Sequence, residues 1–256
     1  MKKQQIAAQL YTLREFTQNV RDIEETLRRV SQIGYTAVQV SGFGPIEPAL
    51  LKSYTDKYNL TICATHTAYD RIKNQTEQVI SEHKLWGCRY VGLGGMPQEY
   101  RTGYQGYMDF VSEFDALGRI YAQNGLKLIY HNHDFEFEKF DGKLGLEIIL
   151  EGAKAGSYEM EIDTYWVQSG GGDPVDWIYR SKGQMGVVHF KDMAIKDRKQ
   201  VFAEIGEGNL DWAAIIKACD DIGVVWAAVE QDKCMRDPFD SLELSFKNIE
   251  SMLGGG

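Results

Sequence analysis

Short apolar segments recur along the whole chain, and a longer amphipathic segment follows each of them. The short segments are four or five residues long and mostly apolar, as expected of strands that are buried on both faces. There are eight of them: Ile6–Leu10, Ala37–Val40, Thr61–Thr65, Tyr90–Leu93, Lys127–Tyr130, Tyr158–Ile162, Gly186–Phe190 and Trp226–Val229. Their alternation with helical segments predicts consecutive βα units and a parallel sheet.

The longer segments carry the signals of amphipathic helices. From Val20 to Val30, apolar residues recur close to the 3.6-residue period, and Gly34 follows where a C-cap is expected. Segments 104–123 and 212–222 repeat this pattern. Asp211 stands at the N-cap position of the second, and Asp173-Pro174 predicts the start of one more helix.

Length and motifs favour a closed (β/α)8 TIM barrel over an open doubly wound sheet. The chain has 256 residues, and about 250 is typical of this barrel. The glycine-rich segment 92–95 does not match the GxGxxG pattern of a dinucleotide-binding open sheet. No linker divides the chain, so we expect one barrel domain over 1–253 and a flexible glycine tail over 254–256.

Composition narrows the classes of partner. The formal net charge of -9 and the absence of a dense basic segment argue against a nucleic-acid partner. No segment reaches the roughly 18 apolar residues of a membrane helix, and the first residues do not look like a secretory signal. The four cysteines are scattered without a CxxC pair, as in a reduced protein. We therefore expect a cytoplasmic protein with no membrane partner.

Candidate catalytic residues gather where the later strands end, which is where (β/α)8 barrels carry their active sites. Glu136, Asp163, His189 and Glu230 follow four consecutive predicted strands. Glu136 and Asp163 are 27 residues apart and Asp163 and His189 are 26 apart, which is about one βα repeat in each case. Glu230 comes 41 residues after His189 because segment 193–209 is an evident insertion. This spacing places the four side chains at one level of the barrel.

Three carboxylates that converge in a partly buried cleft require a counter-charge, because like charges at short range repel. We predict one divalent metal ion, held by Glu136, Asp163, His189 and Glu230. An oxygen-rich ligand set with one imidazole suits Mn²⁺, Mg²⁺, Co²⁺ or Zn²⁺. Taken singly, each acidic residue could instead cap a helix or pair with a lysine, and His189 alone could be a structural histidine. Their occurrence on successive strands favours the metal.

The chain resembles the xylose-isomerase-like TIM barrels of the sugar phosphate isomerase/epimerase family, which includes ketose 3-epimerases and inosose dehydratases. The segments that carry the resemblance are 9–14 (QLYTLR), 130–137 (YHNHDFEF), 163–166 (DTYW), 189–192 (HFKD), 206–212 (GEGNLDW) and 229–232 (VEQD). The resemblance implies a Glu/Asp/His/Glu site for one metal, with Mn²⁺ favoured. It transfers to Glu136, Asp163, His189 and Glu230, with Glu138 as a rival to Glu136.

The resemblance also implies a mechanism. Glu136 and Glu230 would act as acid and base on opposite faces of a hydroxy-ketone, through an enediolate that the metal stabilises. Candidate substrate-binding residues are His66, His133, Lys191 and Trp166. Trp166 stands where the ketose epimerases carry a histidine, which puts their substrate preference in doubt for this chain. His83 lies in a predicted helix, and we expect it on the surface without a functional role.

Several functions remain open at this point. The leading hypothesis is an isomerase or epimerase of a small sugar-derived hydroxy-ketone, free or phosphorylated. A dehydratase or lyase acting on an inosose or keto-sugar needs the same groups, and a barrel that binds sugar without turnover is a third alternative. Phosphodiester hydrolysis would require more histidines than the five present. Segments 94–95 and 206–208 are candidate phosphate loops, although turns explain them equally well. Homo-oligomers are common among such barrels.

Overall fold

The eight predicted strands form a closed parallel barrel. The computed structural model describes residues 1–153 and 157–254. Around the barrel the strand order is β1, β2, β3, β4, β5, β8, β9, β12 and back to β1. Their bounds are β1 Ile6–Gln9, β2 Ala37–Val40, β3 Thr61–His66, β4 Tyr90–Leu93, β5 Lys127–His131, β8 Tyr158–Asp163, β9 Val187–Phe190 and β12 Trp226–Val229. Each strand is confirmed to within one residue at either end.

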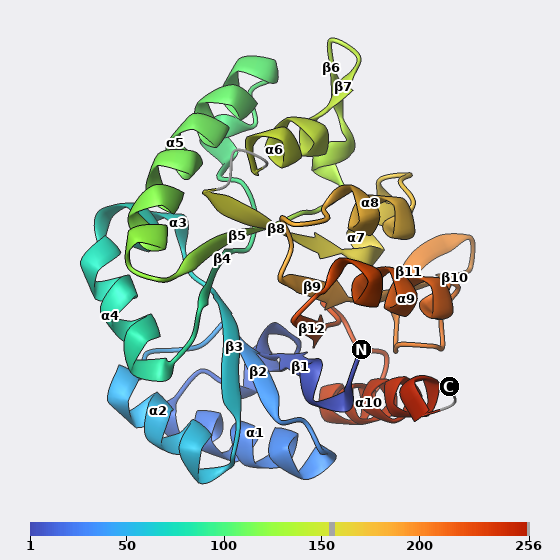
Figure 1. Ribbon diagram of the computed structural model, residues 1–256. Helices are drawn as coiled ribbons and strands as arrows, with labels where there is room; N and C mark the ends of the chain where they lie inside the picture. The colour runs from blue at the N-terminus through green and yellow to red at the C-terminus, as the bar shows by residue number, and fades with distance from the viewer. Residues whose placement is uncertain (154–156, 255–256) are drawn as a thin grey trace.

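Helices surround the barrel, and the first residues of the chain lie beside its last helix (Figure 1). The helices are α1 Val20–Ile33, α2 Pro48–Lys57, α3 Tyr69–Asn74, α4 Thr76–Trp86, α5 Tyr104–Gln123, α6 Gly145–Ala153, α7 Thr164–Ser169, α8 Pro174–Arg180, α9 Trp212–Ile222 and α10 Pro238–Gly254. Short 3-10 helices are η1 Lys3–Gln5, η2 Leu10–Phe16, η3 Gln98–Tyr100 and η4 Phe135–Phe137. Gly254 belongs to α10, and the rest of the predicted tail lies outside the described residues.

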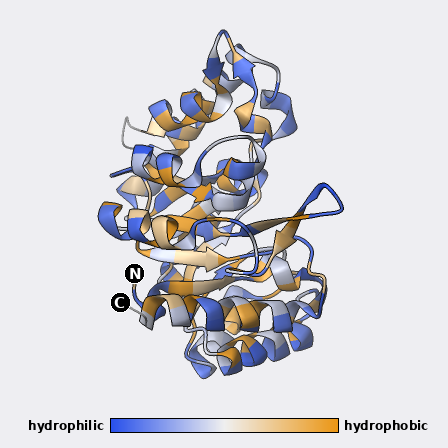
Figure 2. Ribbon diagram, turned by 90° about the vertical axis from the view of Figure 1, so that its right-hand side faces the viewer, coloured by the Kyte–Doolittle hydropathy of each residue, from blue (hydrophilic) through white to orange (hydrophobic). Residues whose placement is uncertain are grey.

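The ends of the helices follow the local signals in the sequence. Asp211 and Asp173 cap α9 and α8 by accepting hydrogen bonds from the backbone N–H groups of Ala214 and Val175. Gly34 ends α1 with a φ of 118°, a left-handed conformation that favours glycine. The outer helices carry both hydrophobic and hydrophilic residues (Figure 2). In α1 the buried residues Ile23, Leu27 and Val30 recur along one face, as in an amphipathic helix. No helix in the described part of the chain is long and apolar enough to cross a membrane.

Two antiparallel hairpins extend from the barrel: β6 Lys139–Phe140 with β7 Lys143–Leu144, and β10 Asp192–Lys196 with β11 Lys199–Ala203. The second hairpin begins the predicted insertion, and the Asp192 carboxylate fastens the loop that follows it. This carboxylate accepts hydrogen bonds from the backbone of Gly206 at 2.8 Å and Gly208 at 3.1 Å, and from the indole of Trp212 at 2.6 Å. These donors of segment 206–208 are therefore engaged within the protein, which argues against its use as a phosphate loop.

The expectation that His83 lies on the surface is wrong. His83 points inward from α4, and only 1% of it is exposed. Its Nδ1–H donates to the carbonyl of Val79 at 2.7 Å, and its Nε2 accepts from the hydroxyl of Thr65 at 2.9 Å. Both ring nitrogens are satisfied, which is what allows an imidazole to be buried here. His83 lies among polar residues in a predicted helix, so the sequence did not indicate its contact with Thr65 on β3.

Candidate active site

Four buried side chains meet at the carboxyl ends of the later strands. His131 ends β5, Asp163 ends β8, His189 lies in β9, and Glu230 directly follows β12. Each offers one potential ligand atom, and these atoms all lie within 4.8 Å of one another. The group contains three of the four predicted ligands, with His131 in the place predicted for Glu136. Two imidazoles and two carboxylates form a donor set that fits a first-row divalent cation such as Mn²⁺, Co²⁺ or Zn²⁺.

Glu136 is buried but does not belong to this group. It lies in η4, five residues beyond the end of β5. Its carboxylate accepts hydrogen bonds from the Tyr130 hydroxyl at 2.6 Å and from the His133 backbone N–H at 2.9 Å. Burial raises the pKa of Glu136 to about 7, although the bond from Tyr130 opposes this. The rival Glu138 is exposed and likewise lies outside the group.

Both ring nitrogens of His131 lie near acceptors. Its Nδ1 is 3.3 Å from the carbonyl oxygen of Gly94, and its Nε2 is 3.1 Å from an Asp163 carboxylate oxygen. In the tautomer with the proton on Nδ1, which bonds to Gly94, Nε2 carries the lone pair and is the nitrogen that would bind a cation. His131 lies in segment 130–137, which carries the family resemblance, but the ligand predicted from that segment was Glu136.

His189 lies between two sets of acceptors. Its Nδ1 is 3.1 Å from a Glu230 oxygen and 3.7 Å from an Asp163 oxygen. Its Nε2 is 2.9 Å from the Gln39 carbonyl oxygen and 3.3 Å from a Glu161 oxygen. Burial lowers the pKa of His189, but the Glu161 carboxylate outweighs it and raises that pKa well above its usual value. With Nε2–H oriented by Gln39 and Glu161, Nδ1 is the nitrogen that would bind a metal, and the metal would displace the proton that the raised pKa places there.

Glu161 is a functional candidate that the sequence analysis did not select. It is fully buried, and it accepts hydrogen bonds from His66 Nε2 at 2.8 Å and from Gln39 Nε2 at 2.8 Å. Burial opposes ionisation, yet His189 and His66 together lower the pKa of Glu161 below its usual range. Because the proton of His66 sits on Nε2, its Nδ1 remains an acceptor. The period of two along β8 places Glu161 and Asp163 on the same face, and this signal could have revealed it.

Lys191 brings a positive charge into the cluster. Its buried ammonium lies 3.0 Å from Glu230, 2.5 Å from Asp232 and 3.5 Å from Asp163. Burial would lower the pKa of Lys191, but Glu230, Asp163 and Asp232 outweigh it and raise that pKa. Part of the counter-charge that the carboxylates need is therefore supplied by the protein. The case for a metal rests less on charge than on the convergence of the four donor atoms.

A cleft of about 510 Å³ opens beside the cluster, in the size range of small-molecule sites. Glu230 is the one carboxylate on its wall among the described residues, and the imidazoles of His66, His131 and His133 line it as well. Burial lowers the pKa of His133 to about 3, so this ring is neutral at physiological pH. Two of the four predicted substrate-binding residues, His66 and His133, thus face the cleft.

Lys191 and Trp166 are not on the wall of this cleft, although both lie close to it. The Trp166 ring is 5.2 Å from the His133 ring, and the Lys191 ammonium is 5.2 Å from the Trp166 ring. The Trp166 indole N–H is buried and finds no hydrogen-bond partner among the described residues. An unpaired buried donor is costly, so Trp166 remains a candidate for contact with substrate.

A closed parallel barrel with a His, Asp and Glu cluster at the carboxyl ends of its strands defines a class of TIM-barrel proteins with a candidate metal-assisted site. The family model described as "Xylose isomerase-like TIM barrel" matches residues 27–244. The chain belongs to this family, as the sequence motifs indicated.

Relatives of known name and known structure give more detail. The chain is 22% identical to an inosose dehydratase of Klebsiella pneumoniae, with 90% of each protein covered, and 20% identical to an inosose dehydratase of Geobacillus kaustophilus, with 90% of this chain and 87% of the relative covered. A sugar phosphate isomerase/epimerase from Parabacteroides distasonis superposes with a TM-score of 0.81 at 22% identity over 98% of this chain and 95% of its own. An L-ribulose 3-epimerase gives 0.72 at 15% identity, covering 98% and 94%.

Proposed function

We propose that this chain is a metal-dependent enzyme that removes a proton from the carbon next to the carbonyl of a small, sugar-derived hydroxy-ketone and so isomerises or epimerises it. The observation that carries the proposal is the position of Glu230. Its carboxylate belongs to the four-residue cluster and also lies on the wall of the cleft. One group is thus adjacent both to the candidate metal and to the space for a substrate.

His131, Asp163, His189 and Glu230 would hold the metal, with Mn²⁺ favoured and Co²⁺ or Zn²⁺ as alternatives. Two imidazole ligands in place of one make Mg²⁺ a weaker candidate than the sequence alone suggested. When bound, such a cation acts as a Lewis acid that polarises a carbonyl and stabilises negative charge on its oxygen. This stabilisation is what makes a carbon acid beside a carbonyl accessible to a carboxylate base.

The residues of the chain supply the proton transfers. Lys191 lowers the pKa of Glu230 against the effect of burial, which keeps the carboxylate ionised as a base requires. His66 is the second acid/base candidate, since Glu161 holds its Nε2–H and its Nδ1 is an acceptor. Glu136 takes no part in this scheme, because its carboxylate is held by Tyr130 and the backbone away from the cleft wall. The acid/base pair expected from the family, Glu136 with Glu230, is replaced here by His66 with Glu230.

Elimination is the second candidate function. The same abstraction of a proton by Glu230 would be followed by loss of a hydroxyl or alkoxyl group from the next carbon, and this group would leave as water or an alcohol with the proton that Glu230 removed. The curated relatives in Klebsiella pneumoniae and Geobacillus kaustophilus are both named inosose dehydratase, which favours this outcome. The two reactions share their first step and differ in what leaves the substrate.

A deuterium experiment tests both. The metal-loaded protein is incubated in deuterated water with a panel of ketoses and inososes, and the products are analysed by NMR and mass spectrometry. Deuterium at the carbon next to the carbonyl in an isomer or epimer supports the first function, and a dehydrated product supports the second. Glu230→Gln should lower exchange at least 100-fold, whereas the exposed control Glu138→Gln should retain it. Full exchange by Glu230→Gln would refute the assigned base.

A further inference from the structure

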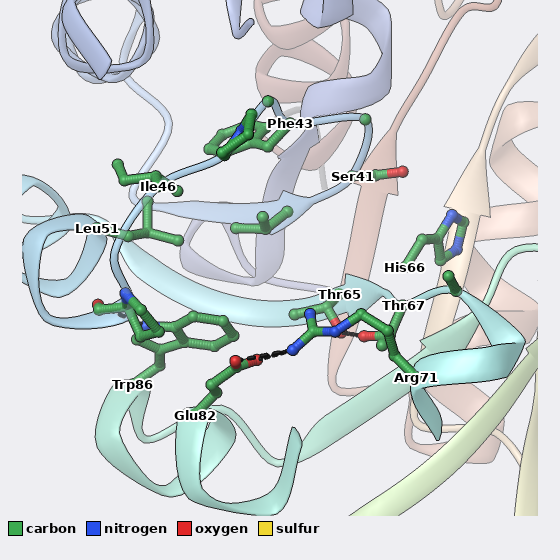
Figure 3. Close-up of a pocket in the computed structure, with 16 residues that line it drawn as sticks. Ser41, Phe43, Ile46, Leu51, Thr65, His66, Thr67, Arg71, Glu82 and Trp86 are labelled. Atoms are coloured by element: carbon green, nitrogen blue, oxygen red, sulfur yellow. Dashed lines mark hydrogen bonds and ion pairs between the residues drawn. The ribbon is translucent and has the colours of Figure 1, made fainter. Parts of the chain in front are cut away.

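A second cavity, of about 420 Å³, adjoins the catalytic cleft. Both are lined by Ser41, His66, Thr67 and Ala68, so these four residues form the boundary between them. The second cavity, here called the side chamber, lies between the loop that follows β2 and the helices α3 and α4 (Figure 3). Since the cleft alone is already within the usual size range of small-molecule sites, the side chamber offers room for a second part of the substrate.

Part of the wall of the side chamber is apolar. Phe43, Ile46, Leu51 and Trp86 surround the space, and Figure 3 shows these side chains grouped on the side away from His66. The indole N–H of Trp86 donates to the carbonyl of Pro48 at 3.0 Å, which fixes the orientation of its ring. A fixed aromatic ring next to aliphatic side chains is suited to stacking against a flat apolar group.

The charged groups in the side chamber neutralise each other. One nitrogen of Arg71 lies 2.8 and 2.9 Å from the two carboxylate oxygens of Glu82, which is only 8% exposed. Gln78 donates a further hydrogen bond to Glu82 at 3.0 Å. Arg71 and Glu82 pair with each other, and the hydroxyls of Thr65 and Thr67 lie 2.9 Å apart. Most of the polar side chains described on this wall are therefore already engaged, which leaves little for a phosphate or for the many hydroxyls of a second sugar ring.

We propose that the side chamber binds a neutral aromatic ring that is linked through oxygen to the sugar whose carbonyl lies in the cleft. The substrate class is thus an aryl-substituted keto-sugar rather than a free or phosphorylated monosaccharide. His66 lines both spaces, so the link between the two rings passes beside it. The inference rests on the proposed function only for the sugar half of the ligand.

Binding of unreactive probes to the whole protein tests the side chamber without any turnover. Phenyl β-D-glucopyranoside, methyl β-D-glucopyranoside and cellobiose are titrated by calorimetry. Burial of a phenyl ring should make the phenyl glycoside bind at least tenfold more tightly than the methyl glycoside. Ile46→Trp narrows the chamber where the phenyl ring would lie, and Phe43→Ala removes part of its wall. Each should abolish this tenfold advantage and leave the methyl glycoside unaffected. Both residues are half-buried, so the variants do not depend on repacking the barrel core.

The matched control is Ile120→Trp, the same substitution at a residue of α5 that is 44% exposed and does not line the chamber. It should bind all three probes as the wild type does. Equal affinities for the phenyl and methyl glycosides would overturn the proposal, as would an advantage that survives both chamber variants. Tighter binding of cellobiose than of the phenyl glycoside would also overturn it, in favour of a second sugar ring. Failure of deuterium exchange with both free and phenyl-substituted keto-sugars would refute the proposed function and leave this binding result standing.

Discussion

The stability of the protein should depend on the neutral state of His83. This residue is buried in α4, and its ring contacts the Val79 carbonyl and the Thr65 hydroxyl, which are both uncharged. Burial lowers the pKa of His83 to about 4, although the bond to Val79 opposes this. In the unfolded chain the pKa should return to about 6.5. Between these two values the unfolded chain binds a proton that the folded protein excludes.

This difference fixes the sign and the size of the effect. The folded protein holds His83 neutral, so its contribution is fully present above pH 6.5 and is lost as the pH falls toward 4. For pKa values of about 4 and 6.5, linkage gives a loss of about 2 kcal/mol in the free energy of unfolding between pH 7.5 and pH 5. Below pH 4 the loss approaches about 3 kcal/mol.

Urea denaturation at pH 7.5 and pH 5 measures this loss. Other groups titrate over the same range, so the informative quantity is the difference between the wild type and His83→Gln. Glutamine retains one donor and one acceptor but cannot take up a proton. The wild type should lose about 2 kcal/mol more than the variant between the two pH values. An equal loss in both proteins would refute the assignment of His83 as a buried neutral imidazole.

Three further predictions follow from the cluster and its surroundings. Replacing Asp192 by Ala should lower the free energy of unfolding, measured in urea, by about 3 to 5 kcal/mol, because several buried donors lose a charged acceptor. A loss below about 1 kcal/mol would show that the loop with Gly206 and Gly208 does not depend on this carboxylate. Glu161→Gln should weaken Mn²⁺ binding about 10- to 100-fold in calorimetry, because His189 and His66 lose the group that orients them, and unchanged affinity would contradict that role. Glu136→Gln should bind Mn²⁺ within a factor of about three of the wild type, and loss of the metal would restore Glu136 as a ligand.

The strands and the overall architecture were predictable because their signals are local. Each strand is an unbroken apolar segment between turn residues, and β2, β4 and β12 begin and end where the pattern predicts. The helix caps at Asp173, Asp211 and Gly34 also depend on residues within one turn of the helix end. A sequence contains all of this information in contiguous stretches.

The candidate site was only partly predictable, because its geometry depends on how the chain leaves each strand. Asp163 and His189 lie within strands, and Glu230 directly follows one, so counting βα repeats located them. Glu136 lies beyond the end of β5 in a 3-10 helix, and the contact with Tyr130 that turns it away from the cleft is a tertiary one. The imidazole of His131, the last residue of β5, takes the place in the cluster that was predicted for Glu136.

Glu161 and His83 were missed because their partners come from distant parts of the chain. Glu161 is held by Gln39 and His66, and His83 by Thr65, all of which lie on β2 or β3. The alternation of side chains along β8 would have placed Glu161 inside the barrel, but no local pattern reveals a hydrogen bond across it.

Metal binding by four variants tests the central claim most directly. Mn²⁺ is titrated into the metal-free wild type and into His131→Ala, Asp163→Asn, Glu230→Gln and Glu136→Gln, with stoichiometry and affinity measured by calorimetry and by electron paramagnetic resonance of the free ion. We expect one Mn²⁺ per wild-type chain, at least tenfold weaker binding in the first three variants, and nearly normal binding in the last. A wild type that binds no divalent metal, or a His131→Ala variant that binds as well as the wild type while Glu136→Gln does not, would contradict the central claim.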